Sequence, residues 1–166
     1  MILAIDVDYG EGEAHAAGVL FEDWGDAEPK RKILTTVSPI NEYIPGQFYR
    51  RELPCIQEIL KGISEPIDFI IVDGYVYLTD EKKPGLGKYL YDDLDGEVPV
   101  IGVAKSSFVN TPPDCEVFRG ESNKPLYVTA AGVEKELAKD FIKSMHGEFR
   151  FPTLLKEVDS LCRSWR

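Results

Sequence analysis

Two short apolar segments of this chain each carry an aspartate in a position where a carboxylate is difficult to bury. The segment Ile2–Val7 is apolar and β-branched apart from Asp6. The run Phe69–Val72 is continuously apolar and is followed directly by Asp73. Continuous apolar runs of this length are typical of strands that are covered on both faces of a sheet. Because an unpaired buried carboxylate is strongly unfavourable, the fold must supply something that compensates both acids.

The remaining hydrophobic pattern predicts an α/β fold. Short apolar or alternating runs predict strands, and apolar residues at helical spacing predict helices. The expected strands are Ile2–Val7, Ala14–Phe21, Lys32–Val37, Phe69–Val72, Val98–Ala104 and Leu126–Ala130, and the expected helices are Phe48–Ile63, Gly87–Tyr91, Val133–Met145 and Thr153–Trp165. The first three strands follow at hairpin distance and favour antiparallel pairing, whereas helices separate the later ones and favour parallel pairing. We therefore expect one domain, residues 1–166, with an RNase H-like mixed central sheet flanked by helices.

Length and composition restrict the class of protein further. A chain of 166 residues fits a single domain. No segment approaches the roughly 20 apolar residues of a membrane span, and the N-terminus has no signal-peptide pattern. The three separated cysteines fit neither a disulfide framework nor the close pairs of a zinc site. We expect a soluble, cytoplasmic protein that does not associate with membranes.

The charge distribution leaves two interpretations of the basic residues open. A formal net charge of −10 argues against a generic nucleic-acid binder, because backbone affinity comes mostly from Lys and Arg. It does not exclude a nuclease whose carboxylates hold metal. The basic residues are grouped at Lys30–Lys32, at Arg50 and Arg51, and at Lys82, Lys83 and Lys88. These groups either form a rim that faces phosphates or are scattered solvated charges.

The acids have the chemistry of a divalent-metal site. Neighbouring strands lie about 5 Å apart, so Asp6 and Asp73 could share one ion, and oxygen ligands of this type suit Mg²⁺ or Mn²⁺. Glu52, in the first turn of an expected helix, is either a third ligand or water acceptor, or an ordinary acid that complements the helix dipole. Asp8 lies on the same strand face as Asp6 and is either an accessory ligand or the start of a turn.

Lys105 follows the expected strand Val98–Ala104 and is the basic candidate for this site. A lysine there could offset negative charge that develops on a phosphate during cleavage. The simpler interpretation is a cation at a strand end whose aliphatic stem covers apolar surface.

Five segments of the chain, in this order, carry a resemblance to a known family. They are AIDVDYG, EYIPGQFYRRELP, FIIVDG, VPVIGVAKSSF and KPLYVTAAG, and the resemblance that they carry runs from about residue 2 to 150. This set closely resembles the endonuclease V family. The resemblance implies an RNase H-like fold and metal-dependent hydrolysis of a phosphodiester on the 3′ side of a deaminated adenine. The substrate would be inosine or deoxyinosine in RNA or DNA, in DNA repair or RNA processing.

The resemblance also assigns roles to individual residues. It places the metal-site acids of the family, which bind Mg²⁺ or Mn²⁺, on Asp6, Glu52 and Asp73, and its catalytic lysine on Lys105. Glu52 would then orient or deprotonate the attacking water.

Substrate contacts follow from the same resemblance. The YIPG segment corresponds to a strand-separating wedge, with Tyr43, Ile44 and Pro45 against the bases beside the lesion, and Gly46 allowing the turn. Gly74 begins the loop that surrounds the lesion in the family. An aromatic ring and a proline can replace stacking while a base is turned out of the helix.

Two departures from the family pattern raise a second functional hypothesis. Family members have a histidine where this chain has Gly132, which suggests the loss of a group that positions water or a second metal ion. The bulky Tyr75 and Tyr77 stand in the lesion-pocket loop, where they could fill the space of a flipped base. The alternative is therefore a catalytically weakened or inactive member that binds modified or structured nucleic acid, or a protein partner.

Overall fold

The computed structural model describes residues 1–38, 45, 49–79, 81–108 and 111–166. Its described strands form a seven-stranded mixed sheet in the order β3-β2-β1-β4-β5-β7-β6. The strands are β1 (Ile2–Gly10), β2 (Glu13–Phe21), β3 (Arg31–Val37), β4 (Phe69–Asp73), β5 (Val100–Ala104), β6 (Glu116–Val117) and β7 (Leu126–Ala131). The α/β prediction and the six expected strands are confirmed, and β6 is an addition.

The central strands pair as the sequence pattern predicts. β1 and β2 form an antiparallel hairpin, and β3 continues it antiparallel to β2. β4 pairs parallel with β1, and β5 pairs parallel with β4. Since β1, β4 and β5 run in the same direction, their carboxyl ends meet at one edge of the sheet.

The direction of β7 differs from the expectation of parallel strands after the hairpin. β7 pairs antiparallel with β5, and β6 pairs antiparallel with β7. Between β5 and β7, the described helical structure is the short 3₁₀ helix Pro113–Cys115. A parallel strand requires a long crossover, usually a helix, to return the chain to the starting edge. Without one, the chain re-enters the sheet from the edge at which β5 ends.

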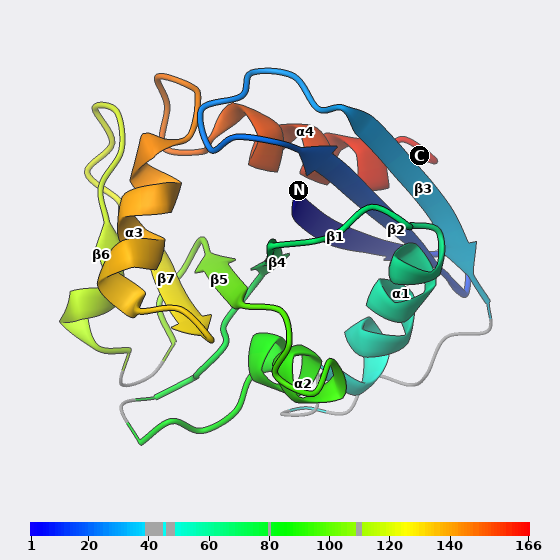
Figure 1. Cartoon of the computed structure of the whole chain (residues 1–166), viewed down its shortest axis with the longest axis horizontal. Coiled ribbons are helices and arrows are strands. Elements are labelled where there is room, and N and C mark those ends of the chain that lie inside the picture. The colour runs from blue at the N-terminus through cyan, green and yellow to red at the C-terminus, as the bar shows by residue number, and fades with distance from the viewer. Residues whose placement is uncertain (39–44, 46–48, 80, 109–110) are drawn as a thin grey trace.

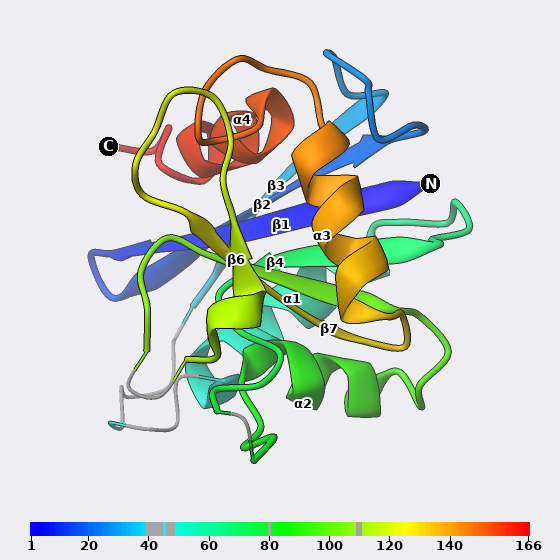
Figure 2. The same cartoon turned by 90° about the vertical axis from the view of Figure 1, so that its left-hand side faces the viewer.

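Two helices cover each face of the sheet (Figures 1 and 2). The helices are α1 (Tyr49–Lys61), α2 (Leu86–Asp93), α3 (Lys135–Ser144) and α4 (Thr153–Cys162). The apolar stripes of α1 and α2 pack on one side of the strands, and those of α3 and α4 pack on the other. This arrangement explains why the apolar runs of β4 and β5 are continuous, because both faces of these strands are buried.

No helix in the described part of the chain is long and apolar enough to cross a membrane. The three cysteines, Cys55, Cys115 and Cys162, are buried and form no disulfide.

Candidate active site

Asp6 and Asp73 lie side by side at the carboxyl edge of the parallel strands. In the register of β1 and β4, Ile5 pairs with Val72, so the next residue on each strand is an aspartate. Both carboxylates line one small pocket between the sheet and α4. The sequence-based prediction that the two acids converge is confirmed in geometry.

Glu52 reaches the same place from the opposite face. It lies in the first turn of α1 and is 6% exposed, although glutamate is rarely this buried. Burial, followed by the negative charge of Asp6, raises the pKa of the Glu52 carboxyl to about 8. An acid that served only the helix dipole would lie in solvent, so the dipole interpretation does not account for its position.

A fourth carboxylate, Asp159, completes the group and was missed in the sequence analysis. Ligand atoms of Asp6, Asp159 and Cys162 lie within 4.8 Å of one another. Asp159 is on α4 among buried residues of its inner face, Leu155 and Cys162. An acid within the apolar stripe of a helix is the same kind of anomaly as Asp6 in a buried strand, and that signal could have identified it.

We call Asp6, Glu52, Asp73 and Asp159 the acidic centre. Burial, repulsion from Asp73 and a hydrogen bond with the Asp159 carboxyl together raise the pKa of Asp6 to about 8. The N–H of Val7 donates to Oδ1 of Asp6 over 2.9 Å, which lowers that pKa only in part. Loss of solvent also raises the pKa of Asp73 above its ordinary value, while the charge of Lys105 lowers it.

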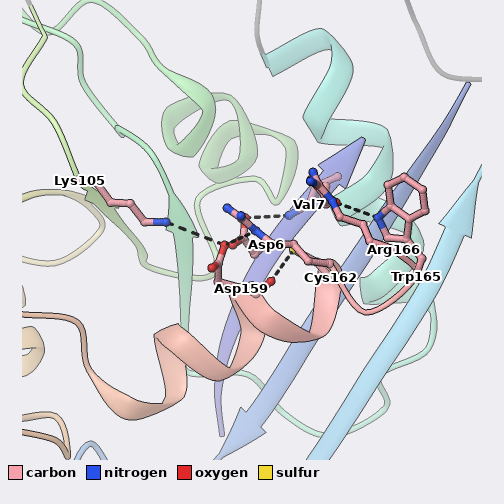
Figure 3. Close-up of polar contacts among 9 residues, drawn as sticks. Asp6, Val7, Lys105, Asp159, Cys162, Trp165 and Arg166 are labelled. Atoms are coloured by element: carbon pink, nitrogen blue, oxygen red, sulfur yellow. Dashed lines mark hydrogen bonds and ion pairs between the residues drawn. The ribbon is translucent and has the colours of Figure 1, made fainter. Parts of the chain in front are cut away.

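Two cations border the acidic centre and form ion pairs with one of its carboxylates, that of Asp159. Nζ of Lys105 lies 3.9 Å from Oδ1 of Asp159, and Nε of Arg163 lies 3.2 Å from the same oxygen. Figure 3 shows Lys105 and Asp159 pointing toward each other beside Asp6. The ion pairs among the described residues include none to Asp6 or Glu52.

The donor set fits a divalent cation. Hard carboxylate oxygens from two strands and two helices converge, and burial, followed by mutual repulsion, raises the pKa of Asp6 and Glu52. A bound cation would remove this repulsion and hold the carboxylates in their ionised form. Mg²⁺ and Mn²⁺ match this ligand type, with the thiol of Cys162 as a softer neighbour.

A larger pocket opens beside the acidic centre. Asp73 and Lys105 form part of its wall, together with Gly74 and the aromatic rings of Tyr49, Tyr75 and Phe108. Gly74 has φ +129°, which L side chains rarely adopt, so glycine is needed where the chain turns away from β4.

The two tyrosines of this loop do not close the pocket. The hydroxyl of Tyr75 donates to the carbonyl of Ser106 over 2.6 Å, which fixes the ring in the pocket wall. Tyr77 lines a different pocket, whose wall also includes Thr129 of β7. The two side chains therefore line different pockets, and of the two only Tyr75 borders the pocket beside Asp73.

Most of the expected wedge lies outside the described residues. This is the case for Tyr43, Ile44 and Gly46, while Pro45 is described and exposed. The segment that contains them connects β3 to α1, and Tyr49 at the start of α1 lines the pocket next to Asp73.

Asp8 is engaged in a different set of contacts, which we call the C-terminal corner: Asp8, Trp165 and Arg166. The guanidinium of Arg166 donates to both carboxylate oxygens of Asp8 at 2.8 Å, and Nε1 of Trp165 donates to Oδ2 at 2.8 Å. Figure 3 shows Trp165 and Arg166 on the other side of Asp6 from Lys105. The accessory-ligand interpretation of Asp8 is not supported, because its oxygens already have partners.

Gly132 lies far from the acidic centre. It follows Ala131, which pairs with Val100 at the first residue of β5, whereas Asp73 pairs with Val103 near the other end. A Cβ at Gly132 would lie 2.7 Å from Cε1 of Tyr91, and φ there is +81°. A side chain at this position neither fits nor faces the carboxylates, so the expected loss of a metal- or water-positioning group is not supported.

One basic group of the sequence consists of paired surface charges. Lys30, Arg31 and Lys32 lie 3.3, 2.8 and 2.7 Å from carboxylate oxygens of Glu22, Glu65 and Glu157, respectively. The solvated-charge interpretation therefore applies to this group.

The fold places the protein in the class of α/β proteins with a seven-stranded mixed sheet, and solved endonuclease V structures share this fold. Among solved structures, endonuclease V of Streptomyces avermitilis superposes with a TM-score of 0.79 at 25% identity, over 99% of this chain and 80% of that one. Human ENDOV superposes with a TM-score of 0.78 at 20% identity, over 99% and 83%.

Sequence comparison gives the family. Residues 1–138 match the model of the family described as Endonuclease V. Endonuclease V of Pyrococcus horikoshii is 33% identical over 165 residues, which cover 98% of this chain and 72% of that protein. Endonuclease V of Streptomyces coelicolor is 28% identical over 186 residues, covering 98% and 78%. The chain belongs to the endonuclease V family.

Proposed function

We propose that this protein is a metal-dependent endonuclease that hydrolyses a phosphodiester on the 3′ side of a deaminated base, inosine or deoxyinosine, in nucleic acid. The observation that carries the proposal is the acidic centre, in which carboxylates from β1, β4, α1 and α4 converge beside an open pocket. Buried acids without matching cations are expected where a metal ion completes the site.

Each residue of the acidic centre has a distinct part in this proposal. Asp6 and Asp73 would hold Mg²⁺ or Mn²⁺ from the sheet, with Asp159 adding a carboxylate from α4. Bound there, the ion would polarise the phosphate and acidify a water molecule. Glu52 lies close enough to Asp6 for their charges to interact, and in its ionised form it would orient that water and accept its proton.

Lys105, which follows the last residue of β5, faces the same space. Its ammonium lies at the border between the small acidic pocket and the larger aromatic one. A phosphate placed between the two would lie close to this charge, which would offset the negative charge that develops during cleavage.

The aromatic pocket supports a base as the recognised group. Tyr49, Tyr75 and Phe108 offer ring faces, and Gly74 leaves space next to Asp73. A base turned out of the helix can stack on such rings while its 3′ phosphate reaches the acids. Ciona intestinalis endonuclease V, a structural relative, was solved in complex with DNA containing an inosine followed by a ribo-adenosine. Tyr43, Ile44, Pro45 and Gly46 would act as the wedge that separates the strands.

A cleavage assay tests the proposal. Single-stranded and duplex oligonucleotides, in DNA and RNA, carry one inosine, with adenine at the same position as the matched control. We expect metal-dependent cutting on the 3′ side of inosine and none with adenine or with Asp6→Ala. Binding without cutting in every substrate and metal would refute the proposal and support the inactive-member alternative.

A further inference from the structure

The side chain of Lys105 is held on two sides. Its Nζ lies 4.7 Å from the centre of the Phe151 ring and 3.9 Å from Oδ1 of Asp159. An ammonium over an aromatic face is attracted by the electron density of the ring. Lysine has four rotatable side-chain bonds, so these contacts select one direction for the ammonium, toward the acidic centre.

The backbone of Lys105 is held by Arg150. The last residue pair between β5 and β7 is Ala104 with Tyr127, so the carbonyls of Lys105 and Pro125 lie beyond the ladder. Nη2 of Arg150 donates to both carbonyls, at 2.6 Å to Pro125, and Nε donates to Pro125 at 3.3 Å. One guanidinium therefore joins the two strand ends.

Arg150 and Phe151 are consecutive residues of a segment that is itself fixed. Arg119, only 6% exposed, donates to the carbonyls of Met145 and Phe149 at 2.6 Å each. It makes further contacts of 3.2 Å to Gly147 and 3.4 Å to Arg150. Among the described residues, none of the ion pairs involves Arg119 or Arg150. Both guanidinium groups therefore serve to order the backbone.

We infer that Arg150 and Phe151 are positioning residues for Lys105. Arg150 fixes its backbone, Phe151 directs its ammonium, and Arg119 holds the segment that carries both. The catalytic consequence rests on the proposed function, because Lys105 must face a phosphate. The positioning itself does not depend on that function and can be measured without substrate.

The first measurement is the rate at which an amine-reactive acylating reagent labels Lys105, followed by peptide mass spectrometry. Lys143, exposed on α3, is the internal reference. In Arg150→Met, we expect labelling of Lys105 relative to Lys143 to rise about three-fold or more, because the amine leaves its contacts. Phe151→Leu should raise it about two- to three-fold, the size of one cation–π contact. Arg150→Lys keeps the charge and one donor group, so its labelling of Lys105 should lie between the values for wild type and Arg150→Met.

Arg31→Met is the matched control variant. Arg31 also donates to a backbone carbonyl, that of Gly62, and to Glu65, but it joins β3 to the end of α1. Its loss should leave the labelling of Lys105 unchanged. An equal rise in both variants would show general loosening and overturn the inference, as would unchanged labelling in Arg150→Met.

The second measurement is a double-mutant cycle on cleavage of the inosine substrate. Arg150→Met should lower kcat about 10- to 100-fold with KM little changed, as for loss of a supporting residue. In the Lys105→Ala background, Arg150→Met should lower kcat less than about two-fold, because the lysine that Arg150 positions is gone. Equal losses in both backgrounds would overturn the inference. If wild type does not cut, the proposed function fails, and the labelling result alone decides the positioning.

Discussion

Asp6 and Asp8 lie two residues apart on one strand, yet they belong to regions with opposite electrostatics. In the C-terminal corner, hydrogen bonds from Arg166 and Trp165 keep the pKa of Asp8 below its ordinary value. In the acidic centre, burial and neighbouring carboxylates raise the pKa of Asp6 to about 8. The same side chain on the same strand face is neutralised in one region and left among like charges in the other.

This difference separates a structural acid from a functional one. Arg166 and Trp165 join the C-terminal end of the chain to β1, and the carboxylate of Asp8 gains stability from them. Asp6 accepts one hydrogen bond from a backbone N–H, and its other neighbours are carboxylates. This arrangement lowers stability unless a cation binds. Function therefore explains the acidic centre better than stability does.

The largest expected difference between the two aspartates is in cleavage. Asp6→Asn should lower metal-dependent cutting of the inosine substrate by about a thousand-fold or more, since a lost metal ligand removes several kcal/mol of transition-state stabilisation. Asp8→Asn, the matched substitution, should change the rate of the folded protein less than about three-fold. Single-turnover cleavage rates of wild type and both variants measure the difference. Comparable losses would remove the distinction between the two regions.

The second difference concerns stability without metal. In the folded protein the pKa of Asp6 is about 8, and in the unfolded chain it is about 4. The folded state therefore binds the proton more tightly, and this stability is lost as pH rises from about 4 to 8. Relative to wild type, Asp6→Asn should gain about 2 kcal/mol at pH 8 and little at pH 4, measured by urea unfolding in chelator. Added Mg²⁺ should stabilise wild type more than the variant, and an equal pH profile for both would contradict the assignment.

The third and smallest difference has the opposite sign. The folded pKa of Asp8 is depressed, so its contribution is present above about pH 4 and is lost as pH falls through the folded value. Arg166→Gln should therefore lower stability at pH 7 by a small amount, as expected for an exposed ion pair, and the loss should shrink below pH 4. Arg166 is 57% exposed, which limits the effect. A loss that persists unchanged at pH 3 would mean that the contact acts through packing and not through charge.

The sequence identified the parts of the site that lie on buried strands. Asp6 and Asp73 interrupt or end apolar runs, and pairing of adjacent strands then places them together. For Glu52, its place at the start of a helix left two interpretations open, a ligand or water acceptor and an acid that complements the helix dipole, and its burial favours the first. Asp159 was not recognised as a site residue. Apolar and polar residues are interspersed along a helix, so an acid there is less conspicuous than one in a continuous apolar run.

The other differences between prediction and structure concern contacts between segments that are far apart in the sequence. β7 runs antiparallel to β5 because the residues described between them include no crossover helix, which the turn-rich sequence before Gly120 did not settle. That direction places Gly132 at the edge opposite the acids, so a difference that looked catalytic in the sequence is distant from the site. Tyr75 and Tyr77 also line two different pockets. The pocket of Tyr77 includes residues of β7, whose position in the sheet the sequence did not predict.

The central claim is that Asp6, and not Asp8, belongs to a divalent-metal site. Calorimetric titration of the metal-free protein with Mn²⁺ tests it most directly, with Asp6→Asn and Asp8→Asn as the matched pair. The structure predicts saturable binding in wild type, the same affinity in Asp8→Asn, and at least about ten-fold weaker binding in Asp6→Asn. Equal Mn²⁺ affinity in wild type and Asp6→Asn would contradict it.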